Sequence, residues 1–176
     1  MTGNAGDGDR ILGSLGVADG KGVVRMEDRF ETAIDDVWSA LTDPGRLVQW
    51  LGDFEGELRP GGEFRAHFSA TGWHGTGRVE ACEPPRHLLL TLRDADPQPG
   101  QPEEGATEVT LAADRDHTVV VWEERGMPVD LLAAYGAGVQ IHVEDLGAYL
   151  AGRERVHSGR WKELFPAYQA LAADRG

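Results

Sequence analysis

The sequence predicts a single α+β domain in which an antiparallel sheet is covered by one long helix. The chain has 176 residues, enough for one substantial core but too few for two ordinary domains. From residue 22 to about residue 127, runs of alternating apolar and polar residues are separated by Gly, Pro and Asp, which is typical of short strands joined by turns. Residues 128–153 instead repeat apolar residues every three or four positions, which predicts a helix.

The N-terminal residues 1–20 are predicted to form a flexible tail. They are rich in glycine and charged residues, so they bury too little apolar surface to offset the entropy lost on ordering. Ile11, Leu12 and Leu15 are the side chains that could still dock locally. Residues 22–30 then alternate with period two, which predicts a half-buried strand.

Two short helices are predicted next, in the stretch FETAIDDVWSALTDPGRLVQWL at residues 30–51. Thr32 is expected to cap the first helix, with Asp35 as a short capping-box partner. Asp43 and Pro44 end this helix and start the next, because Asp suits a cap position and Pro suits the first helical turn. Each helix carries one apolar stripe that includes a tryptophan.

The rest of the chain completes the expected architecture. Short antiparallel strands fill the region after the helix pair, and their apolar faces need the long helix as a cover. A shorter helix is predicted at residues 159–174. It packs either on the rest of the domain or on a second subunit, so a homodimer is one of the possible states. We therefore divide the chain into a tail over residues 1–20, a domain over residues 21–153 and a C-terminal helical extension over residues 154–176.

Composition excludes several classes of function. With 17 basic and 30 acidic residues, the net charge of −13 argues against binding to nucleic acid or to an anionic membrane surface. The sequence contains neither an apolar run long enough to insert into a bilayer nor a secretion signal, so we expect a cytoplasmic protein. Its one cysteine, Cys82, excludes an internal disulfide and zinc sites built on paired thiolates. We expect no metal and no cofactor.

Several stretches, in this order along the chain, resemble the SRPBCC (START-like, Bet v 1-like) superfamily, in the branch related to the C-terminal domain of the activator of Hsp90 ATPase. They are the helix pair quoted above, the glycine-led strand GGEFRAHF, the strand–Pro–strand hairpin GRVEACEPPRHLLLTL and the helical segment GVQIHVEDLGAYL. The resemblance covers roughly residues 22–152. The sequence departs from the family at Val139, where the family usually has a tryptophan.

The resemblance implies a helix-grip fold, with a curved antiparallel sheet of six to seven strands around a long C-terminal helix. A curved sheet and a straight helix cannot touch along their whole length, so a hollow is expected between them, partly plugged by the two short helices. A hydrophobic or amphipathic small molecule, lipid-like or polyketide-like, is its expected occupant. Strand parity and the helix stripe predict its lining residues, which are Trp50, Phe54, Phe64, Phe68, Trp73, Val79, Leu90, Val121, Tyr135, Val139 and His142.

A few polar residues could carry chemistry in such a hollow. His142 lies on the apolar stripe of the long helix and could orient a ligand carbonyl or move a proton, and Tyr135 lies two turns earlier on the same helix. Glu123 and Glu124 end the last strand, and one of them must point toward the helix. An inward carboxylate could act as a base with a raised pKa, or it could pair with an arginine.

Three functions remain open from the sequence. The first is binding of a small molecule, and the second is an enzyme of the cyclase or hydrolase type that uses His142 or Tyr135 in the same pocket. The third, suggested by the family label, is association with a chaperone. His67 and His74 could approach each other, but two histidines without a third ligand make a poor metal site.

Overall fold

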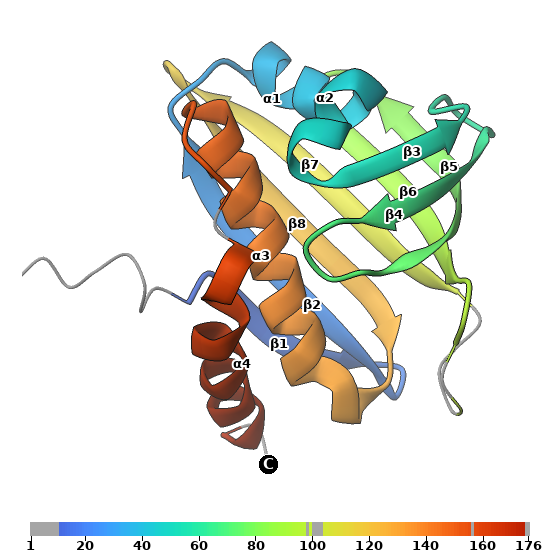
Figure 1. Ribbon diagram of the computed structural model, residues 1–176, viewed down its shortest axis with the longest axis vertical. Coiled ribbons are helices and arrows are strands. Elements are labelled where there is room, and N and C mark those ends of the chain that lie inside the picture. The colour runs from blue at the N-terminus through green and yellow to red at the C-terminus, as the bar shows by residue number, and fades with distance from the viewer. Residues whose placement is uncertain (1–10, 98, 100–103, 156, 175–176) are drawn as a thin grey trace, which may run out of the picture.

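The computed structural model describes residues 11–97, 99, 104–155 and 157–174. The elements follow in the order β1 (Gly13–Ala18), β2 (Lys21–Phe30), α1 (Ile34–Thr42), α2 (Pro44–Trp50), β3 (Gly52–Gly56), β4 (Glu63–Phe68), β5 (His74–Glu83), β6 (His87–Asp94), β7 (Gly105–Asp114), β8 (His117–Met127), the 3-10 turn η2 (Val129–Leu131), α3 (Leu132–Leu150) and α4 (His157–Ala173). Figure 1 shows α3 lying diagonally across the sheet, with α1 and α2 at one end.

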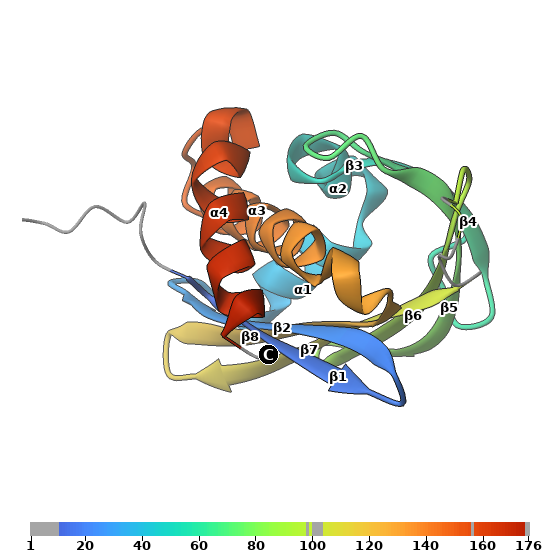
Figure 2. The same ribbon diagram turned by 90° about the horizontal axis from the view of Figure 1, so that it is seen from below.

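The strands form one curved sheet in the order β1-β2-β8-β7-β6-β5-β4-β3, and neighbouring strands are antiparallel. Figure 2 shows the sheet curling from β1 and β2 round to β3 and β4, with α3 on its concave side. The predicted α+β helix-grip architecture is confirmed. The described residues form eight strands rather than six or seven, because residues 13–18 add an edge strand.

Strand β1 is a correction to the expected tail. Gly13 to Ala18 pair with Met26 to Lys21 of β2, and the amide N–H of Leu12 donates to Oε1 of Gln140 at 3.0 Å. A Cβ at Gly13 would lie 2.6 Å from both Met26 and Tyr168, so only glycine lets the strand approach this closely. The pairing with β2, the hydrogen bond from Leu12 to Gln140 and the close packing of Gly13 therefore order this segment. Its composition alone indicates flexibility. The remainder of the expected tail, residues 1–10, lies outside the described residues.

The helix pair forms as predicted, but its first cap differs. Ala33 occupies the N-cap of α1, and the Thr32 hydroxyl instead donates to the Asp36 carboxylate at 2.7 Å. Asp43 caps α2 as expected, accepting from the amide of Gly45 at 2.9 Å. The indole N–H of Trp50 donates to the Ala40 carbonyl at 2.9 Å, which locks the two helices together over the core.

Glycines inside α3 allow close packing on both of its sides. A Cβ at Gly136 would lie 2.6 Å from the Tyr168 ring of α4, and one at Gly147 would lie 2.9 Å from the Phe30 ring of β2. Each glycine costs about 1 kcal/mol of helix propensity relative to alanine. The aromatic side chains that pack against these positions explain why the helix nonetheless contains them.

Helix α4 packs along α3 on the side away from β3 and β4 (Figure 2). Two groups hold it there. The Tyr168 hydroxyl donates to Oε1 of Gln140 at 2.6 Å and accepts from the amide of Gly13 at 3.0 Å. The guanidinium of Arg160, which is 7% exposed, donates to both carboxylate oxygens of Glu144 at 2.8 and 2.7 Å. The C-terminal helix is thus joined to both α3 and the first strand.

Candidate functional site

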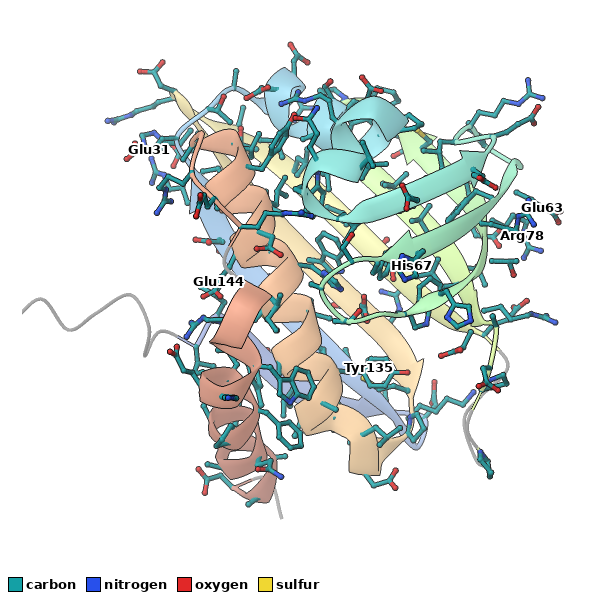
Figure 3. The ribbon with its side chains drawn as sticks, in the orientation of Figure 1. Glu31, Glu63, His67, Arg78, Tyr135 and Glu144 are labelled. Carbon is teal, nitrogen blue, oxygen red and sulfur yellow. The ribbon has the colours of Figure 1, made fainter. Side chains whose placement is uncertain are left out.

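A cavity of about 600 Å³ lies between α3 and the concave face of the sheet. Its walls come from the β4–β5 turn, from the adjoining ends of β6, β7 and β8, and from the N-terminal half of α3. Trp161 of α4 adds one more side chain to the wall. Figure 3 shows Tyr135 between α3 and the end of β8, on the part of the helix that lines this space.

Five of the eleven sequence-predicted lining residues lie on this wall, namely Phe68, Trp73, Tyr135, Val139 and His142. The ring of Phe68 packs on Trp73, with ring centroids 4.8 Å apart. It also meets His142 edge to face, with centroids 5.2 Å apart. The sheet and α3 therefore meet through an aromatic contact at the edge of the cavity.

The other six lie away from the wall, and they are Trp50, Phe54, Phe64, Val79, Leu90 and Val121. Phe54 and Phe64 form a second aromatic layer outside the wall residue Phe68. The ring centroid of Phe54 lies 6.0 Å from that of Phe68 and 5.6 Å from that of Phe64. Trp50 is 1% exposed and belongs to the core beneath the helix pair. These aromatic side chains pack outside the cavity wall. The helix pair α1 and α2 covers that end of the sheet, so the cavity does not extend to it.

Val121 shows how strand parity can mislead. Its neighbours Val120 and Trp122 are buried on the concave side, so Val121 points to the convex face of the sheet. Val79 is a core residue 1% exposed, and it is paired across the strands with Leu90. A register bulge between Val79 and Ala81 shifts the alternation in β5, and the cavity is lined by Leu92, one inward position farther along β6.

The two glutamates at the end of β8 point to opposite faces of the sheet, and each adopts one of the two predicted arrangements. Glu123 points to the convex face, where the guanidinium of Arg125 contacts it at 2.7 Å and also contacts Glu108 at 3.0 Å. Glu124 points inward and lines the cavity. The sequence predicts that one of these two residues is the inward carboxylate. Glu124 pairs with the buried Thr107 of β7, which identifies Glu124 as that residue.

Burial raises the pKa of Glu124 to about 7, although the indole of Trp122 and the hydroxyl of Thr107 both favour the ionised form. The residue keeps some accessible surface because the cavity in front of it is open. Protein atoms nevertheless replace most of the water around the carboxyl. Glu124 is therefore poised between its neutral and charged forms at physiological pH.

Tyr135 and His142 face the same space from α3. Burial raises the pKa of the Tyr135 phenol, and the negative charges of Glu124 and Asp94 raise it further. Tyr135, Glu124 and Asp94 therefore lie close enough for their charges to interact. His142 is 5% exposed, and Asp145, one turn later, is fully buried. Glu144 lies off this stripe and pairs with Arg160 of α4. Figure 3 shows Glu144 on the α4 side of α3.

His67 and His74 are cross-strand partners on β4 and β5, and both are exposed. In the described ranges, no group of three His, Cys, Asp or Glu side chains could hold a metal ion. No helix in the part of the chain that the structure describes is long and apolar enough to cross a bilayer.

Many wall residues lie outside the predicted lining set, and two of them matter most for the chemistry of the cavity. Thr107 is a buried inward residue of β7, and only the register of the sheet places it beside Glu124. Trp161 falls within the predicted C-terminal extension, and its place on the wall depends on how α4 packs against α3. The one sequence signal for Trp161 was its spacing from Phe165 on the predicted helix, and the two rings indeed stack with centroids 5.1 Å apart.

Comparisons with known proteins agree with this architecture. The family described as "Activator of Hsp90 ATPase homolog 1-like protein" matches residues 31–151. The chain resembles the crystal structure of CalU16 from Micromonospora echinospora with a TM-score of 0.72 and 24% identity, over 91% of this chain and 95% of CalU16. No curated protein matches the chain.

Two further solved structures are similar. DynU16, from the dynemicin biosynthetic locus, has a TM-score of 0.67 and 27% identity, over 77% of this chain and 50% of DynU16. Protein MLL2253 from Mesorhizobium loti has a TM-score of 0.65 and 25% identity, over 73% of this chain and 96% of its own. The family match spans more than half of the chain, so the protein belongs to the Activator of Hsp90 ATPase homolog 1-like family of the SRPBCC superfamily.

Proposed function

We propose that the protein binds a hydrophobic or amphipathic small molecule in the cavity between α3 and the sheet. The cavity itself, about 600 Å³ in volume, is the observation that carries the proposal. Its walls combine apolar and aromatic side chains with a few convergent polar groups, which is the usual composition of a small-molecule site. The helix-grip fold of the family is typically ligand-binding, which supports the proposal.

Native mass spectrometry of freshly purified protein tests this directly. We expect a species heavier than the polypeptide by a discrete small-molecule mass, which disappears after denaturation. A fluorescent apolar probe titrated into the delipidated protein provides a second test, because an empty cavity should bind it with saturable stoichiometry near one. Absence of both the bound mass and the saturable probe would contradict the proposal.

Val139 offers a steric test of where the ligand lies. It is 2% exposed and lines the cavity where the family usually has a tryptophan. Replacement by tryptophan should fill part of the space, so we expect Val139→Trp to weaken probe binding at least tenfold, as measured by titration. Val121→Trp makes the same change on the convex face and should leave the affinity within about twofold. Equal binding by Val139→Trp and the unaltered protein would place the ligand elsewhere.

An enzyme acting in the same cavity is the second candidate. The favouring observation is the combination of Glu124, whose pKa of about 7 suits proton transfer near neutrality, with Tyr135 and His142 on the facing helix. The reaction type would be a cyclisation or a hydrolysis. Once a ligand is identified, His142→Ala separates the two functions, because retained affinity with lost turnover favours the enzyme.

The remaining expectations stay predictions. A cytoplasmic location and a homodimer are tested by fractionation and by light scattering. Association with a chaperone is tested by a pull-down with Hsp90, and recovery of Hsp90 with the purified protein would favour that function.

A further inference from the structure

The charge inside the cavity has one dominant sign. Glu124 lies on the wall, and Asp94 and Asp96 lie at the adjoining end of β6. Arg125 is also a wall residue, but its guanidinium is held on the convex face by Glu108 and Glu123. The other basic groups on the wall are the imidazoles of His74 and His142. No lysine occurs among the wall residues that the structure describes, so carboxylates outnumber permanent cations inside the cavity.

Glu124 occupies an unusual position for a carboxylate. The groups that lower its pKa are the neutral hydroxyl of Thr107 and the neutral indole of Trp122, and burial, which raises the pKa, outweighs both. Its cross-strand neighbour on β2 is the buried apolar residue Val24. A carboxylate in such surroundings is costly unless a cation pairs with it. The open side of Glu124 faces the cavity, so a bound ligand could supply that cation.

The same cavity presents several aromatic rings. Phe68 and Trp73 line it from the β4–β5 region, Tyr135 lines it from α3, and Trp161 lines it from α4. Trp161 is 40% exposed, which leaves ring surface available on the wall. Aromatic faces attract an organic cation through their quadrupole, with about 0.5 to 2 kcal/mol for each well-placed ring. Carboxylate and aromatic rings together are the groups that recognise an alkylammonium.

We infer that the ligand of this cavity is an organic amine, whose ammonium group binds Glu124 and whose apolar body packs on the aromatic walls. This inference rests on the proposed function, because it names the chemical class of the molecule bound at the same site. It excludes acidic lipids from the lipid-like ligands that the sequence predicts. A fatty acid or a phosphate ester would bring a second anion next to Glu124, in a protein whose net charge is already −13.

Three probes of the same shape test the inference. They are 2-naphthylmethylamine, 2-naphthylmethanol and 2-naphthoate, which carry a positive, a neutral and a negative group on one aromatic body. We expect calorimetric titration of the full chain at pH 8 and moderate salt to show the amine binding at least tenfold more tightly than the alcohol. We expect the carboxylate to bind most weakly.

The glutamates at the end of β8 provide a matched pair of variants. Glu124→Gln should abolish the preference for the amine over the alcohol. Glu123→Gln removes the same charge from the convex face and should retain the preference. This comparison separates the local carboxylate from the overall negative charge, because both variants have the same net charge.

The pH dependence adds a second readout. As the pH falls through about 7, Glu124 becomes neutral and affinity for the amine should fall, up to tenfold per pH unit. The other titratable wall groups are Asp94, Asp96, His74, His142 and Tyr135, together with the outward-turned Arg125. Because other titratable groups face the cavity, the profile is compared with that of Glu124→Gln, which should be flatter.

The outcomes distinguish the inference from the proposed function. Saturable binding of the alcohol without a preference for the amine would overturn the amine inference and leave the binding function intact. A preference that survives in Glu124→Gln would also overturn the inference, because Glu124 would not be its source. Failure of all three probes to bind would contradict both.

Discussion

Glu124→Gln is expected to raise the free energy of unfolding at pH 8 by about 3 kcal/mol. The folded protein raises the pKa of Glu124 from 4.5 to about 7, so the charged form is disfavoured in the native cavity. A shift of one pKa unit corresponds to about 1.4 kcal/mol, which sets the size of the effect. Glutamine keeps the shape and the hydrogen-bonding capacity of the side chain but never ionises.

The sign of the pH dependence follows from proton binding. Between pH 4.5 and about 7, the folded state retains a proton on Glu124 that the unfolded chain has released. This carboxyl therefore contributes stability at low pH, and the contribution is lost as the pH rises through the folded pKa. The difference between Glu124→Gln and the unaltered protein should be near zero around pH 4.5, grow up to pH 7, and stay constant above it.

Denaturant titrations of both proteins at several pH values measure this difference. Other ionisable groups cancel in the comparison, provided that they are not coupled to Glu124. Glu123→Gln is the matched control, and it should be slightly less stable than the unaltered protein, because it loses an ion pair with Arg125 on the convex face. A pH-independent difference for Glu124→Gln would show that the carboxyl does not titrate abnormally.

Tyr168→Ala is expected to lower the free energy of unfolding by about 3 to 5 kcal/mol. Tyr168 has no exposed surface and is among the largest fully buried side chains of the described residues. Truncation would open a cavity beside Gly136 and remove the hydroxyl that contacts Gln140 and the amide of Gly13. Three elements, α3, α4 and β1, would lose their common contact.

Tyr168→Phe separates the two contributions. It keeps the ring and loses only the hydroxyl, so we expect a loss of about 1 to 2 kcal/mol. Circular dichroism during denaturant unfolding gives both values. Tyr168→Ala should also weaken probe binding in the cavity, because α4 carries the wall residue Trp161. A loss below about 1 kcal/mol for Tyr168→Ala would mean that α4 does not depend on this anchor.

The prediction for Glu124→Gln implies that stability and binding make opposite demands on this side chain. An inward carboxylate without a cationic partner destabilises the free protein, yet it provides the group that would attract an amine. Residues at functional sites often carry such a cost. A ligand that pairs with Glu124 should therefore stabilise the fold more at pH 8 than at pH 5.

Much of the fold was predictable because it depends on local periodicity. Alternation gave the strands, the three- and four-residue repeat gave α3, and Asp43 with Pro44 marked the start of α2. The order of these elements, together with the family resemblance, was enough to predict the helix grip. Strand β1 was missed because its order comes from pairing with β2 and from contacts with residues more than 120 positions away.

The sequence by itself determined the fold class, the high negative charge and the two residues from which the inward carboxylate had to come. Only the tertiary structure decided that Glu124 lines the cavity, that Val121 faces outward and that Trp161 reaches the wall. The physical reason is that side-chain direction depends on strand register, and a single bulge or a one-residue shift reverses it. The docking of α4 likewise depends on contacts between distant segments, which no local pattern encodes.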